Sequence, residues 1–162
     1  MKKYIITISS IILVVAAVLV VKRINEKKAN LEHVKIGVAH LGQITDVMKS
    51  IKDDATFTTH FPDLKAKQTA HEDHLDYGPK RRVVSPEESR IFFPMLQGAS
   101  EHLKKEAERI VYAEGISLEN KKKLVALLRT TLPLDAEING KTWMESCLEN
   151  FEKGRPPFYA EP

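Results

Sequence analysis

The stretch SPEESRIFFPMLQG, residues 85–98, decides the fold class, because it holds the clearest helix start in the chain. Ser85 can accept a hydrogen bond from the backbone amide three residues on, and Glu88 can reach back to the amide of the cap. Pro86 suits the first helical position, where its missing donor would be unbonded anyway. Pro94 clashes with the turn before it, so the pattern predicts that this helix ends or kinks ahead of residue 94.

Three further helices are predicted after this proline. Apolar residues recur at spacings of three and four over residues 98–113, 117–132 and 142–153, and caps, glycine or proline separate these ranges. Thr142 and Glu145 predict a second capping box at the start of the last range. The sequence therefore predicts a helical domain over residues 85–153. Glycine and proline then predict an extended proline-rich tail over residues 154–162.

Two segments of different character precede this domain. Residues 24–52 predict a membrane-proximal amphipathic helix, because apolar side chains recur on one helical face. These side chains are Leu31, Val34, Val38, Leu41 and Met48. A strand over residues 33–39 is the alternative, but no second strand is available to pair with it. Residues 53–84 have scattered aromatics and no sustained period, so they predict a long irregular loop.

The N-terminus predicts a single transmembrane helix over residues 1–23. An uncharged run from Tyr4 to Val21 is about 18 residues long, close to the shortest helix that spans a hydrocarbon core. A cleavable signal peptide would carry a small-x-small site after the run, whereas this run ends directly in Lys22-Arg23. We therefore expect a retained single-pass anchor that contacts the lipid bilayer through residues 4–21.

Two opposing signals bear on the side of the membrane. Lysines and arginines after the run outnumber those before it, which favours a cytoplasmic C-terminal domain. An apolar run that begins at residue 4 resembles an uncleaved secretory signal, which would export everything after it. We favour export, so the C-terminal domain is expected to be extracytoplasmic.

The composition restricts the function. A chain of 162 residues allows one small domain beside an anchor. Its 25 lysines and arginines nearly balance 22 aspartates and glutamates, so the net charge of +3 gives no large field for nucleic acid. The single cysteine, Cys147, excludes an intramolecular disulfide and lies on an apolar helical face, which predicts a core residue. Without a phosphate-binding glycine loop or a GxSxG elbow, the sequence predicts neither an enzyme nor a cofactor.

Two histidines and three carboxylates crowd the stretch AHEDHLDYG, residues 70–78. His71 and His74 would share one face of a helix, and His60 would have to supply a third metal ligand. The stretch lacks the HExxH spacing of zinc proteases. We interpret it as a solvated loop, with a metal site of His60, His71 and His74 as the alternative.

Other charged or titratable side chains are interpreted as solvated helix faces. His33 and His40 lie two turns apart and have a partner or a haem edge as the alternative. The run Lys121-Lys122-Lys123 has lipid head groups as its alternative.

The leading prediction is a non-enzymatic, single-pass membrane protein that acts as an accessory, assembly or interaction subunit of a membrane protein complex or another envelope protein. Its candidate partner-binding residues are more apolar than a short kinked helix needs, and they are Ile91, Phe92, Phe93, Met95 and Leu96. The alternatives are a membrane-anchored metal- or haem-binding module and a small membrane-anchored hydrolase. Toxin neutralisation is one form that the interaction role could take.

Overall fold

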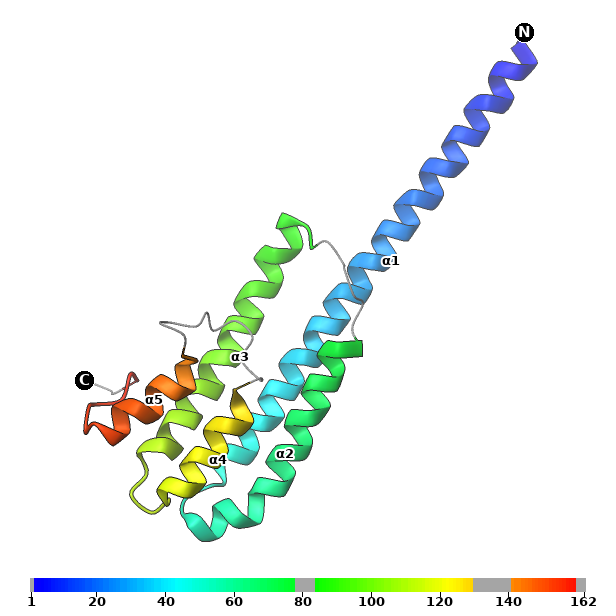
Figure 1. Cartoon of the computed structure of the whole chain (residues 1–162). Coiled ribbons are helices and arrows are strands. Elements are labelled where there is room, and N and C mark those ends of the chain that lie inside the picture. The colour runs from blue at the N-terminus through cyan, green and yellow to red at the C-terminus, as the bar shows by residue number, and fades with distance from the viewer. Residues whose placement is uncertain (1, 78–83, 130–140, 160–162) are drawn as a thin grey trace.

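Five helices make up the fold within the described residues, and no strand occurs among them (Figure 1). The computed structural model describes residues 2–77, 84–129 and 141–159, with side chains from residue 18 onward. The helices are α1 (Lys2–Lys49), α2 (Asp54–Tyr77), α3 (Pro86–Tyr112), α4 (Leu118–Leu128) and α5 (Trp143–Glu152). The predicted mainly α fold with a helical bundle is confirmed.

The first helix, α1, has two environments along its length. Its C-terminal part packs against α2 and α3, whereas its first part projects from the bundle (Figure 1). We call the projecting part, residues 2–26, the stalk. The helix predicted over residues 24–52 forms as far as Lys49, and the alternative strand over residues 33–39 does not form. The reason is a buried face of helical periodicity, made by Leu41, Ile44 and Met48.

The prediction of an irregular loop over residues 53–84 is wrong for most of this range, because Asp54–Tyr77 forms the helix α2. Asp53 caps this helix, since its carboxylate accepts a hydrogen bond from the Thr56 amide at 2.8 Å. The apolar pattern is hard to see because polar side chains take part in the buried face. This face follows helical spacing and comprises Phe57, Leu64, Gln68 and His71.

The helix α3 begins as predicted and does not end ahead of Pro94, which was one of the two outcomes predicted there. The amide of Glu88 donates to Ser85 Oγ at 3.3 Å, and the amide of Ser85 donates to Glu88 Oε2 at 2.9 Å, which is the expected capping box. Pro94 lies inside one continuous helix. The cost of the proline is offset by packing on both sides of it, where Phe92, Leu103, Ala107 and Ile110 are buried.

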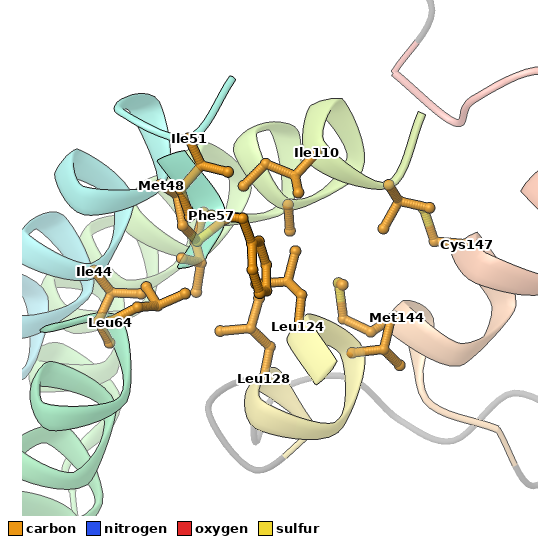
Figure 2. Packing of buried hydrophobic residues seen from close by; sticks show 14 of the residues in the cluster. Ile44, Met48, Ile51, Phe57, Leu64, Ile110, Leu124, Leu128, Met144 and Cys147 are labelled. Carbon is orange, nitrogen blue, oxygen red and sulfur yellow. The ribbon is translucent and has the colours of Figure 1, made fainter. Parts of the chain in front are cut away.

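The core lies where α4 and α5 close the bundle end that is remote from the stalk (Figures 1 and 2). Side chains from all five helices meet there, among them Met48, Phe57, Ile110, Leu124 and Met144 (Figure 2). The helix α4 runs to Leu128, and the predicted extension to residue 132 lies outside the described residues. The predicted capping box of α5 forms, since the Glu145 amide donates to Thr142 Oγ1 at 3.3 Å.

The interpretation of Lys121 as a solvated side chain is wrong. Lys121 is buried, and its ammonium lies 3.6 Å from the centre of the Phe151 ring. Burial lowers the pKa of Lys121 below its ordinary value, while the charge of Asp54 acts in the opposite direction. Lys122 and Lys123 are exposed, as expected for a solvated face. The lysine nearest the α4–α5 contact is therefore part of the packing.

The chain leaves α5 through a left-handed glycine and folds back on α3. Gly154 has a φ of 66°, and the Arg155 amide donates to Asn150 O at 2.9 Å, which completes a Schellman turn. The hydroxyl of Tyr112 then donates to the carbonyl of Arg155 at 3.1 Å. The described part of the tail, residues 154–159, is therefore a non-helical arm held against the bundle.

Candidate functional site

Four histidines from two helices meet along the contact between α1 and α2. His33 and His40 come from α1, and His71 and His74 come from α2. The rings of His33 and His74 stack with centroids 4.0 Å apart. The ring of His40 lies edge-on to His74 at 5.4 Å and to His71 at 6.1 Å. We call these four residues the histidine cluster.

The spacing along each helix explains why the rings meet. His33 and His40 are seven residues apart and His71 and His74 three apart, so each pair lies on one side of its helix. Gly37 lies between the first two and leaves the α1 backbone bare, so that a methyl group there would meet the His74 ring at 3.8 Å. The ring of His74 thus packs directly onto α1.

A hydrogen bond fixes the tautomer of one ring. Nε2 of His74 lies 2.9 Å from the carbonyl oxygen of His33. A carbonyl oxygen can only accept, so Nε2 of His74 must carry a proton. This bond runs from α2 to the backbone of α1 and joins the two helices near the C-terminal end of α2.

The rings of His40 and His71 each have a nitrogen without a hydrogen-bond partner among the described protein groups. Nδ1 of His40 and Nδ1 of His71 are buried and have no hydrogen-bond partner among the described protein groups. Burial is the largest cause that lowers the pKa of His71, followed by the charges of His40 and His74, and Glu72 opposes them. Burial also lowers the pKa of His40, together with His74 and Lys67. Both effects favour the neutral form of His40 and of His71.

The three histidines suggested as metal ligands do not come together. His60 lies eleven residues before His71 on the same helix, which places it about 16 Å away along the axis. His71 and His74 do meet, but with His33 and His40 as their neighbours. Within the described residues, no group of three or more histidine, cysteine, aspartate or glutamate side chains is placed to hold a metal ion.

Sequence reasoning missed the contribution of α1 to this cluster. The histidines at positions 33 and 40 were interpreted as solvated, although both are partly buried. A seven-residue spacing places two side chains on one helical face, but it does not identify the helix that covers this face. That information lies in the packing of α1 on α2.

The five candidate partner-binding residues divide between surface and core. Ile91 is 57% exposed and Phe93 is 59% exposed, whereas Phe92 is buried. Met95 and Leu96 are half-buried. Met95 lines a shallow groove of about 360 Å³ between α1 and α3, whose other walls include Val38, Thr45, Ala99 and His102. Ile91 and Phe93 are thus the two members of the set that a partner can reach directly.

A buried carboxylate holds the C-terminal arm. Glu108 of α3 accepts hydrogen bonds from the backbone amides of Phe158 at 2.5 Å and Tyr159 at 2.8 Å. The thiol of Cys147 lies 3.8 Å from the same carboxylate. Burial, with the adjacent Glu108 charge, raises the pKa of Cys147 to about 12. The thiol is therefore protonated near neutral pH, and its core position agrees with the expectation from sequence.

The part of the chain with described side chains contains no helix that combines the length and the hydropathy needed to cross a membrane. The side chains of residues 4–17, which make up most of the predicted anchor, lie outside that part. Comparisons of the chain with protein-family models, with curated proteins and with solved structures found no match.

Proposed function

We propose that the chain is a membrane-tethered accessory or interaction subunit, in which α1 joins the anchor directly to the partner-binding bundle. The observation that carries this proposal is the continuity of α1. The same helix contains the uncharged run from Tyr4 to Val21 and contributes Ile44 and Met48 to the bundle core. A continuous helix supports a fixed connection between the two parts, because it leaves no loop between them.

The surface of the stalk supports the tether. Val18, Leu19, Val20 and Val21 are each more than half exposed, and they continue the apolar run that precedes them. Exposed apolar surface of this extent favours transfer out of water, and a bilayer is the environment that suits one long apolar helix. In this proposal, residues 4–21 lie in the bilayer. In the same proposal, the bundle lies on the extracytoplasmic side.

Ile91 and Phe93 support the interaction role. They lie on α3 at the end of the bundle that is nearer the stalk, as the order along α3 in Figure 1 shows. Exposed aromatic and aliphatic side chains are typical anchors of protein interfaces. A partner in the same envelope would meet them close to the membrane, so the proposed partner is a membrane protein complex or another envelope protein.

The test is a pull-down of the full chain from native membranes in mild detergent, through a tag after Pro162. We expect a membrane protein to co-purify in stoichiometric amount. The variants Ile91→Asp and Phe93→Asp should lose it, because each puts a charge into the interface. The matched control is Leu118→Asp, which places the same charge at another exposed apolar residue, at the bundle end remote from the stalk (Figure 1).

Two results would overturn the proposal. One is a chain that purifies alone under these conditions while carrying about one equivalent of zinc, copper or iron, which would favour the metal-binding alternative. The other is equal loss of the partner in all three variants, because it would show that the charge acts through general disruption. Metal analysis of the same eluate separates these results.

A further inference from the structure

We infer that the histidine cluster makes the contact between α1 and α2 sensitive to pH, so that the C-terminal part of α2 detaches from α1 in mildly acidic solution. The inference concerns the bundle itself and does not depend on the proposed membrane tether.

Several imidazoles, which all gain a positive charge on protonation, lie close together where α1 meets α2. Four imidazoles lie within two helical faces, and three of their ring pairs have centroids between 4.0 and 6.1 Å apart. Neutral rings can pack against one another in these three pairs. A proton on one ring disfavours a proton on the next, because like charges at these separations repel strongly where water is partly excluded.

Two rings of the cluster have no acceptor in place for an additional N–H donor among the described protein groups. An imidazolium donates from both ring nitrogens, whereas a neutral imidazole needs only one donor satisfied. Nδ1 of His40 and Nδ1 of His71 are buried and have no partner among the described protein groups. Protonating either ring therefore leaves a buried N–H without an acceptor or forces the ring to move toward water.

The charged residues near the cluster do not outweigh the effect of burial on His40 and His71. On α2, Lys67 disfavours protonation of His40, and Glu72 favours protonation of His71. Glu72 also accepts a hydrogen bond from Gln68, which divides its interactions. On α3, Glu88 accepts from Asn30 of α1 at 3.1 Å and belongs to the capping box of its own helix. Burial remains the largest influence on both His40 and His71, and it opposes protonation.

The sign of the pH dependence follows from linkage. Both histidines have a lowered pKa in the folded state, so the unfolded chain binds protons more readily than the folded chain does. The cluster is therefore stable above the ordinary histidine pKa of about 6.5, and its stability falls as the pH drops through that value. Because α2 ends beside His33, the turns from residue 68 to residue 77 should open first.

The experiment is amide hydrogen exchange on the full chain at pH 7.5 and pH 5.5, with rates corrected for the intrinsic effect of pH. We expect protection over residues 68–77 to fall about tenfold at the lower pH. Protection over residues 103–111 of α3 should be kept, because that segment is core. The double variant His40→Gln/His71→Gln should lose the pH dependence. The control His60→Gln changes a histidine of the same helix outside the cluster and should retain it.

Three results would overturn the inference. If protection over residues 68–77 does not change with pH, the C-terminal part of α2 does not detach. If protection falls equally over the whole bundle, the pH change unfolds the protein globally and not at α2. Persistence of the effect in the double variant would assign it to other groups. If that variant fails to fold, ring resonances of the unaltered protein answer the question by nuclear magnetic resonance, since at least two of the six histidines should then titrate below the ordinary value.

Discussion

Single polar side chains join the ends of neighbouring elements in this bundle. Arg109 of α3 donates to Met48 O at 2.8 Å, and so it satisfies one of the terminal carbonyls of α1. Asp54 of α2 accepts from the Ser117 amide at 2.8 Å, where α4 begins. Glu108 plays the same part for the C-terminal arm. At the residue scale, the bundle is positioned by side chains that complete the backbone hydrogen bonding of another element.

Replacing Glu108 tests this view at one position. In Glu108→Ala, the amides of Phe158 and Tyr159 lose their acceptor, and we expect the free energy of unfolding to fall by about 2–4 kcal/mol. Urea denaturation measures this change. Glu101→Ala is the matched control, because Glu101 is an exposed residue of α3 whose side chain accepts a hydrogen bond from Gln97 on the same helix. It should change stability by less than about 0.5 kcal/mol. Equal effects of the two variants would contradict the role given to Glu108.

The histidine cluster shows what single-residue patterns leave out. The stretch with His71 and His74 was interpreted as a solvated loop, whereas both residues lie on α2, with His71 buried and His74 half-buried. The partners of the two rings are more than thirty positions away in the chain. Such a meeting depends on how far α2 slides along α1, and this offset is set by the whole interface.

At the element scale, local signals defined the ends of helices better than their interiors. Both capping boxes, at Ser85 and at Thr142, form as predicted, because a cap depends on residues within one turn. The break at Pro94 does not occur, and α2 was missed, because both outcomes depend on burial against other helices. The buried face of α2 includes Gln68 and His71, so its apolar period is weak in the sequence.

Two glycines differ in backbone conformation, so replacing each with alanine should change the stability of the protein in opposite directions. Gly154 has a φ of 66°, so Gly154→Ala should destabilise the protein by about 1 kcal/mol through strain at the end of α5. Gly98 lies inside α3, and an added methyl group there meets nothing within 4 Å. Gly98→Ala should therefore stabilise the protein by about 0.5–1 kcal/mol. Thermal and urea unfolding measure both, and a shift of the same sign in the two variants would contradict the assigned conformations.

At the scale of the whole molecule, composition and helical periodicity predicted a mainly α bundle, and this prediction is confirmed. The division into an anchor over residues 1–23 and a domain over residues 85–153 stays a prediction. The size of the domain was underestimated, since α2 and the later turns of α1 also belong to the bundle. These segments contribute Ile44 and Phe57 to the core, and only the assembled packing shows it (Figure 2).

The proposed tether is tested by one charge in the middle of the apolar run. Leu13→Arg should cost about 2.5–3.5 kcal/mol at the centre of a membrane helix, and this run is short and already contains Thr7, Ser9 and Ser10. We expect the variant to leave the membrane fraction on alkaline carbonate extraction, whereas the control Leu13→Ile should remain there. Circular dichroism verifies that the bundle is folded. A folded Leu13→Arg protein that resists extraction as the unaltered chain does would contradict the tether.

The continuity of α1 also fixes the direction in which the bundle faces. A helix turns by about 100° and rises by about 1.5 Å with each residue, so the number of residues between Val21 and Leu41 sets both the azimuth and the height of the bundle relative to the apolar run. One inserted residue would swing Phe93 about a third of the way around the axis, while four would nearly restore its direction and raise it by about 6 Å. The number of residues in this part of α1 therefore determines the direction in which the exposed face of α3 points.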